Sequence, residues 1–255
     1  AYRKISHSVT GCDELGLDTS IANVMWWYGD YALYSTFFQI PDYDFYFMME
    51  YDVALRDPDG TYLQQLADRL ASHESADLDL VGPYHSPIKV MKPNRPFRYA
   101  QGWSVMFSAT GFSRRAIAHL YGERLKERSL PPNPGNRHTY CEIFAPSALA
   151  AAGGYRAMSL NDLMPGSIER RTFNVGGHRL FGHEDMLPID SALIHPVLDL
   201  PHYLQKCLTF AQRNDQRPEF AARMDALQAR GVPADLLRGA REALGLSAEA
   251  ELALN

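Results

Sequence analysis

The sequence predicts an α/β fold in which a mixed sheet is flanked by helices and is followed by a helical C-terminal extension. Short apolar runs of strand length alternate with amphipathic segments of helical spacing through about residue 195. After residue 200 the pattern is helical throughout. With 46% hydrophobic and 22% charged residues, the composition is that of a globular protein. We therefore expect an α/β domain at residues 1–200 and a helical extension at residues 201–255.

The first third of the chain contains the clearest strand. Apolar residues at helical spacing in 21–27 indicate a short helix. The aromatic run Tyr43–Met49 follows a Pro-Asp turn and predicts a buried strand. Leucines and alanines spaced i, i+3, i+4 and i+7 predict an amphipathic helix over residues 63–71.

The rest of the chain alternates between short strands and helices. Further strands are expected at residues 78–81, 103–108, 140–144, 171–175 and 191–194. Ser113 is typical of a helix N-cap, and Gly153 is typical of the residue that ends a helix over 147–152. In the C-terminal extension, Pro218 and Pro233 stand at helix starts, and glycines stand at the helix ends.

The composition also limits the partners and the location of the protein. Its net charge of −5 argues against a nucleic-acid partner, which would require a basic face. No apolar run is long enough for a transmembrane segment, and no signal peptide is expected. The three cysteines, Cys12, Cys141 and Cys207, lack paired spacing, which favours a reducing compartment. We therefore expect a cytoplasmic protein.

Two carboxylates stand directly after the aromatic strand, in the triplet Glu50-Tyr51-Asp52. Ligands of open α/β sheets bind outside the carboxyl ends of the strands. In extended chain, alternation sends Glu50 and Asp52 to the same side, where paired oxygen ligands suit Mg²⁺ or Mn²⁺. The alternative is that they are two solvated charges at a strand end.

The segment Pro41–Val53 resembles the stretch around the acidic DXD-type motif in bacterial GT-A glycosyltransferases, where an aromatic strand leads into an acid-X-Asp triplet followed by Val. The resemblance implies a GT-A-like, Rossmann-related fold and a role in polysaccharide biosynthesis. It further implies a nucleotide-sugar donor, a glycan or other hydroxyl acceptor, and Mn²⁺ or Mg²⁺ bound by Asp52. Glu50 would contact the metal, its waters or the ribose. The first acid is Glu here rather than Asp, which leaves the role of Glu50 open.

Two later residues match further landmarks of that family. In inverting members an acid at the position of Glu142 is the general base for the acceptor hydroxyl, and His195 resembles the histidine that completes the metal site. A sugar hydroxyl is a weak nucleophile, so a base is chemically required. Alternatively, Glu142 caps a helix or pairs with an arginine, and His195 is structural. If the reaction retains configuration, Glu142 is not a base.

Four residues are candidates for contacts with donor or acceptor: Tyr51, Trp103, Lys92 and Arg95. A tryptophan face stacks on sugars, and Lys and Arg offset the charge of a diphosphate. A buried Trp and solvated cations are the alternatives. GT-A folds open with a nucleotide-binding βαβ unit, yet only some 50 residues precede the triplet. That unit is either compressed into residues 1–35 or lies outside this chain.

A rival cluster contains His178, His183, Glu184 and Asp185, and His178, His183 and Asp185 are its candidate site residues. Asp185 is an alternative base to Glu142, and the three residues could instead form the metal site of a hydrolase. The spacing matches no zinc-binding signature. A loop that closes over the donor, with Gly176-Gly177 and Gly182 as hinges, is equally compatible with this segment. A third interpretation is a non-catalytic interaction protein built on a degenerate transferase fold.

Overall fold

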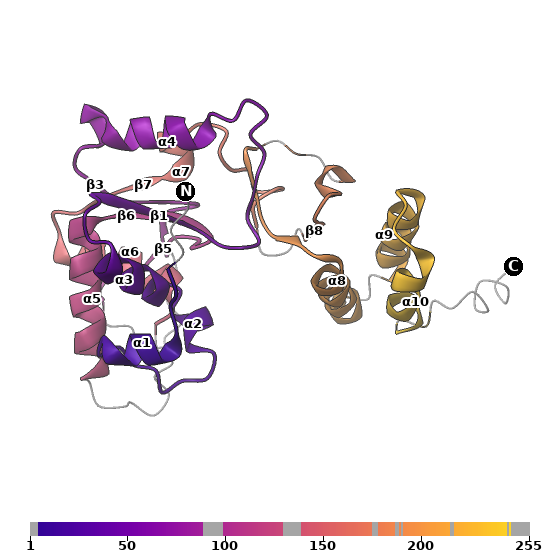
Figure 1. Ribbon diagram of the computed structural model, residues 1–255, viewed down its shortest axis with the longest axis horizontal. Coiled ribbons are helices and arrows are strands. Elements are labelled where there is room, and N and C mark those ends of the chain that lie inside the picture. Colours follow the sequence, from indigo (N-terminus) through magenta and orange to yellow (C-terminus); the bar gives the residue numbers. More distant parts are fainter. Residues whose placement is uncertain are drawn as a thin grey trace, which may run out of the picture. The chain divides into compact units, whose positions relative to one another are not determined.

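The structure, a computed structural model, describes residues 5–88, 99–129, 139–174, 178–186, 189, 191–214, 217–243 and 245 (Figure 1). The chain forms two compact units, Ala1–Ile168 and Glu169–Asn255. The domain boundary expected at residue 200 falls inside the second unit.

The first unit is built on a four-stranded mixed sheet, which confirms the α/β class (Figure 1). Its strands, in spatial order, are β1 (Phe45–Met49), β6 (Ala109–Ser113), β3 (Leu78–Gly82) and β7 (Arg156–Ser159). Strand β6 is antiparallel to both β1 and β3, whereas β3 and β7 are parallel. Strands β1, β3 and β7 therefore all end at the same edge of the sheet.

Helices flank this sheet on both faces. Figure 1 shows α4 (Tyr62–Ala71) and α7 (Leu160–Leu163) on one face, and α3 (Asp30–Gln39), α5 (Arg114–Arg128) and α6 (Cys141–Ala152) on the other. The remaining helical elements are α1 (Val9–Glu14), α2 (Val24–Trp27) and a 3₁₀ turn at His73–Ser75. The helices predicted at 21–27 and 63–71 are confirmed by α2 and α4. Described residues before β1 include no strand.

A glycine of β6 makes room for the aromatic side chains of the neighbouring strand β1. Phe47 lies opposite Gly111, and a Cβ atom at Gly111 would lie 2.4 Å from Cε1 of Phe45 and 2.8 Å from Cδ2 of Phe47. The two aromatic rings of β1 therefore lie over the bare backbone of β6. Because Gly111 has no side chain, β6 can pair with the aromatic strand β1 without a steric clash.

A buried ion pair joins α3 to α5. Arg124, whose side chain is 1% exposed, donates from Nε to Asp30 Oδ2 at 2.8 Å and from Nη2 to Oδ1 at 3.0 Å. The rings of Tyr28 and Phe144 lie 4.4 and 3.6 Å from its guanidinium carbon. Burial opposes the charge of Arg124, but the carboxylates of Asp30 and Glu127 outweigh it and hold the pKa of Arg124 above its usual range.

The strand predicted at 140–144 is wrong, because these residues begin helix α6 with Tyr140 as N-cap. Pro146 lies inside α6 and has no N–H to donate to the carbonyl of Glu142, four residues earlier. That carbonyl accepts instead from the N–H of Val105 at 2.9 Å. The external partner explains how α6 can include a proline and begin at residue 141, six residues before the helix predicted over 147–152.

Other boundaries also differ from the prediction. The run 103–108 is not one strand: β5 (Trp103–Ser104) pairs with β4 (Ser86–Pro87), and β6 begins only at residue 109. Ser113 caps α5 as predicted, accepting from the N–H of Ala116 at 3.1 Å. Strand β7 was not predicted. A two-residue strand, β2 (Ala54–Leu55), follows the acidic triplet.

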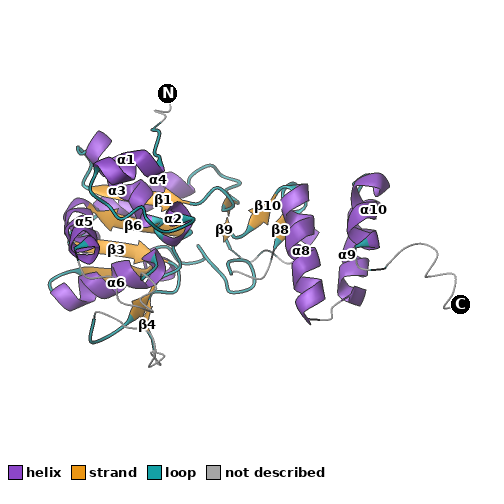
Figure 2. Cartoon of the chain, turned by 90° about the horizontal axis from the view of Figure 1, so that it is seen from below, coloured by secondary structure: helices purple, strands orange, loops and turns teal. Residues whose placement is uncertain are grey.

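The second unit contains three helices in the described part of the predicted extension (Figure 2). It consists of α8 (Leu200–Asn214), α9 (Arg217–Ala229) and α10 (Ala234–Glu242), preceded by a 3₁₀ turn (Glu184–Met186) and by strands β8 (Arg179–Leu180), β9 (Leu193–Ile194) and β10 (Val197–Leu198). Strands β8 and β10 are parallel, and Leu180 and Leu198 pack into the helical core. Residues 171–174 form a turn with a single bridge between Phe173 and His195; Val175 lies outside the described residues.

No helix in the described ranges is both long and apolar enough to cross a lipid bilayer.

Candidate functional site

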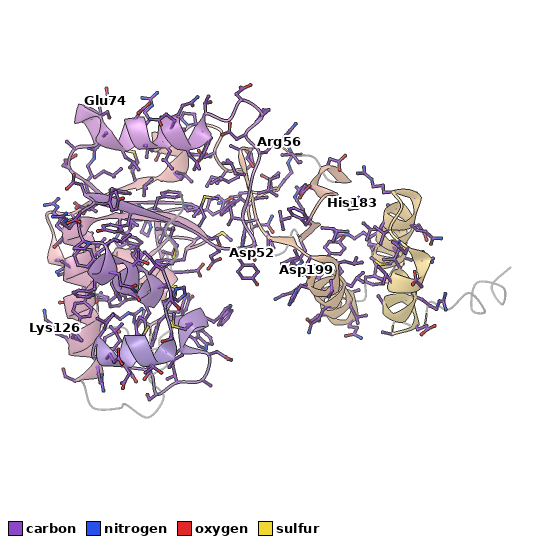
Figure 3. The ribbon with its side chains drawn as sticks, viewed as in Figure 1. Asp52, Arg56, Glu74, Lys126, His183 and Asp199 are labelled. Carbon is purple, nitrogen blue, oxygen red and sulfur yellow. The ribbon has the colours of Figure 1, made fainter. Side chains whose placement is uncertain are left out.

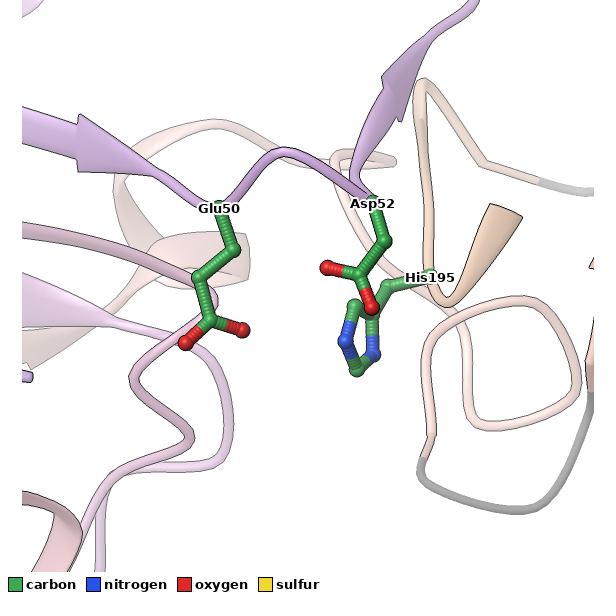
Figure 4. Close-up of side chains that lie close together, drawn as sticks. All are labelled: Glu50, Asp52 and His195. Atoms are coloured by element: carbon green, nitrogen blue, oxygen red, sulfur yellow. The ribbon is translucent and has the colours of Figure 1, made fainter. Parts of the chain in front are cut away.

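The acidic triplet lies at the sheet edge where β1, β3 and β7 end. The N–H of Glu50 still pairs with the sheet, donating to Ser108 O at 2.9 Å. The chain then turns, because the N–H of Val53 donates back to Glu50 O at 3.1 Å. A turn, and not the extended chain expected from the sequence, therefore presents Glu50 and Asp52 (Figure 4).

Burial, a hydrogen bond from Ser108 and the charge of Asp52 all affect the pKa of the Glu50 carboxyl group. It reaches solvent, yet desolvation by the surrounding protein raises its pKa above the usual range. A hydrogen bond from the side chain of Ser108 acts in the opposite direction, and the charge of Asp52 raises the pKa further. A cation at this position would relieve the repulsion between the two acids.

Glu142 lies in the first turn of α6, half-buried. Its Oε1 accepts from the N–H of Phe107 at 3.4 Å. Burial raises the pKa of Glu142, the Phe107 N–H lowers it, and the charge of Glu50 raises it. The same glutamate, Glu50, therefore interacts electrostatically with both Asp52 and Glu142. Acidic groups from the turn after β1 and from the first turn of α6 therefore affect one another electrostatically.

His195 comes from the second unit, directly after β9. It is 7% exposed, its N–H donates to Thr172 O at 2.8 Å, and its ring centroid lies 5.2 Å from that of Phe173. In the first unit, Glu50 and Asp52 each offer a carboxylate oxygen, and these oxygens lie within 4.8 Å of each other (Figure 4). Two carboxylates and an imidazole are a donor set that fits a divalent cation.

The other predicted contact residues differ in position. Tyr51 points away from the fold, with 93% of its surface exposed. Lys92 and Arg95 lie outside the described residues. The nearest described cation in the sequence after Asp52 is Arg56, an exposed residue just beyond β2 (Figure 3). It was not predicted as a site residue.

Trp103 forms an aromatic pair with His85. Their ring centroids are 4.8 Å apart, and the planes lie within 11° of parallel. The backbone of Trp103 is fixed to α6, because its N–H donates to Ser147 Oγ at 2.8 Å and its carbonyl accepts from the same hydroxyl at 3.2 Å. Burial lowers the pKa of His85, so this half-buried stack is neutral at pH 7. The sequence offered no signal that His85 would join Trp103.

The rival residues do not form a metal group in the part of the chain that the structure describes. His178 and His183 line one pocket in the second unit. Asp185 is exposed and forms an ion pair with Arg230 at 2.6 Å. The use of Asp185 as a base stays a prediction.

Comparisons with protein-family models, with curated proteins and with solved structures find no match to this chain.

Proposed function

We propose that this protein is a metal-assisted glycosyltransferase of the GT-A type, which moves a sugar from a nucleotide-sugar to a hydroxyl of a glycan or another acceptor. The observation that carries the proposal is the electrostatic interaction among three carboxylates, because Glu50 interacts with both Asp52 and Glu142. Glu50 follows β1 at the edge of the sheet where the parallel strands end. Ligands of open α/β sheets bind at such an edge.

The donor subsite requires positive charge, which the acidic edge itself lacks. Asp52, Glu50 and His195 would hold a divalent cation, and when bound it would stabilise the negative charge that develops on the departing diphosphate. Exposed Arg56 stands four residues after Asp52 and could contact the same phosphates. Tyr51, exposed between the two acids, is available to the base or ribose of the donor.

The acceptor subsite would lie beside Glu142. The Phe107 N–H holds its carboxyl group, and the raised pKa makes it a stronger proton acceptor than an ordinary glutamate. Glu142 would remove the proton from the acceptor hydroxyl as the bond to the donor sugar breaks. The Trp103–His85 stack is joined to the same region, since residue 105 donates to the Glu142 carbonyl. It offers an apolar surface suited to the face of a pyranose ring.

The decisive experiment is a thermal-shift panel of UDP-, GDP-, CMP- and dTDP-sugars, each with and without Mn²⁺. We expect one nucleotide class to raise the melting temperature in a metal-dependent manner, because a ligand stabilises the state that it binds. Asp52→Asn should abolish this increase. Asp59→Asn, which removes an exposed acid from the neighbouring turn, is the matched control and should leave it unchanged.

His195→Gln provides a second test of the same site. It should weaken the Mn²⁺ dependence of the shift and leave the choice of nucleotide unchanged. If folded wild-type protein shows no shift with any nucleotide, the donor site is refuted. A shift that needs no metal and survives Asp52→Asn would refute the role of the triplet.

A further inference from the structure

The second unit encloses a pocket of about 200 Å³ between helices α8 and α9 and the segment around β8. Its lining combines charged, imidazole, phenol and apolar side chains: His178, Arg179, Leu180, His183, Glu184, Tyr203, Ala222, Arg223 and Ala226. Figure 3 labels His183 in this unit. None of these residues takes part in the proposed transfer reaction.

Arg223 is the half-buried cation of this pocket, and it also lines the smaller neighbouring pocket. Its Nη1 donates to Cys207 Sγ at 3.8 Å. Desolvation acts to lower the pKa of Arg223, whereas Tyr203 and Cys207 raise it; among the described groups that act on Arg223 there is no carboxylate.

The two partners cannot neutralise the guanidinium at physiological pH. Burial raises the pKa of Tyr203 to about 12 and also raises that of the Cys207 thiol, so both groups are protonated and neutral near pH 7. Half-buried charges in proteins are usually matched by an opposite charge, because removing them from water is costly. Among the described residues, Arg223 therefore has no carboxylate as an ion-pair partner, although Glu184 lines the same pocket.

The other charged groups of the pocket are already engaged. Arg179 is buried, and its Nη1 donates to Glu184 O at 2.7 Å. The Glu184 carboxylate accepts the N–H of Gly182 at 2.9 Å. In the neighbouring pocket, Glu219 is solvent-exposed.

We propose that this pocket binds a small oxyanion, the carboxylate or phosphate group of a ligand, through Arg223 with hydrogen bonds from His178 and His183. Leu180 and Ala226 would contact the apolar part of the same ligand. The proposal is independent of the transferase function, because none of its residues is assigned a role in the transfer reaction.

The test is calorimetric titration of the full chain with inorganic phosphate, pyrophosphate, acetate and glucuronate at constant ionic strength. We expect saturable binding of at least one of them, and the series separates a phosphate from a carboxylate preference. Arg223→Met keeps the apolar stem and removes the charge, so it should weaken binding at least about tenfold. Arg238→Met, which removes an exposed charge from α10, should not change binding.

Melting temperatures separate a binding role of Arg223 from a structural one. If Arg223 binds the anion, Arg223→Met loses the anion-dependent increase in melting temperature but stays as stable as the wild type without anion, because a poorly compensated charge has been removed. Ala226→Leu, which fills the pocket and keeps the charge, should also abolish binding. Saturable binding to none of the four anions, or equal binding to Arg223→Met, would overturn the proposal.

Discussion

The carbonyl oxygen of Glu142 accepts a hydrogen bond of 2.9 Å from the backbone N–H of Val105. In an uninterrupted helix this carbonyl would bind the N–H of residue 146, but residue 146 is proline. The carbonyl left without a helical donor by Pro146 therefore connects the segment before β6 to the start of α6 by a hydrogen bond. It also brings the N–H of Phe107 to the Glu142 carboxyl group.

We expect Glu142→Gln to remove catalysis and keep donor binding. The amide preserves an oxygen that can accept from Phe107, so the local fold should survive, but it cannot take a proton. Transfer should fall by about 10²- to 10⁴-fold, the usual contribution of a general base. The check is kcat for transfer beside the metal-dependent thermal shift with the donor. Unchanged kcat would remove Glu142 from the mechanism and favour Asp185 or a retaining reaction.

We expect Trp103→Ala to raise the KM for a sugar acceptor about threefold to tenfold, because stacking on an aromatic ring contributes about 0.5–1.5 kcal/mol. Affinity for the donor should be unaffected. The matched control is Trp26→Ala, which removes a tryptophan that is 73% exposed on α2. Equal effects of the two substitutions would show that Trp103 has no specific role in acceptor binding.

Local sequence patterns correctly predict the elements whose conformation is determined by their own residues. The aromatic run before Glu50 is a buried strand as predicted, and the leucine spacing of 63–71 is a helix. The failure at 140–144 has a non-local cause, since the helix is stabilised there by Val105, about 40 residues away in the sequence. Strand β7 was missed for the same reason: its pairing with β3 joins residues far apart in the chain.

In the candidate site, too, the sequence predicts the local features but not those that depend on tertiary contacts. The sequence places Glu50 and Asp52 after a strand, but the turn that presents them depends on the Val53 N–H reaching Glu50 O. The interaction between Glu50 and Glu142 and the stacking of His85 on Trp103 follow from tertiary structure. A single sequence carries no record of such contacts.

Asp79 should make the stability of the first unit depend on acid pH. It is 1% exposed, and its burial opposes ionisation, but hydrogen bonds from Arg115, Ser113 and the N–H of Arg156 outweigh burial and lower its pKa. A carboxyl group with a lowered folded-state pKa stabilises the fold above its unfolded pKa, about 4, and loses that contribution as pH falls through the folded value.

Urea unfolding of wild type and Asp79→Asn between pH 7 and pH 2.5 measures this contribution. The wild type should be the more stable at pH 7, and the difference should shrink below about pH 4. Asp59→Asn, at an exposed turn, should show no such pH-dependent difference. A difference between wild type and Asp79→Asn that stays constant across the range would contradict the assignment.

Gly111→Ala should destabilise the sheet by about 1–3 kcal/mol, because a methyl group would overlap the rings of Phe45 and Phe47 and force them from their positions. Gly122→Ala is the matched substitution: residue 122 lies within α5 and a Cβ there meets no atom within 4 Å. Alanine at that helix position should stabilise by about 0.5–1 kcal/mol. Urea unfolding of the two variants should therefore shift in opposite directions. If Gly111→Ala were as stable as wild type, the rings of β1 would not be packed over β6.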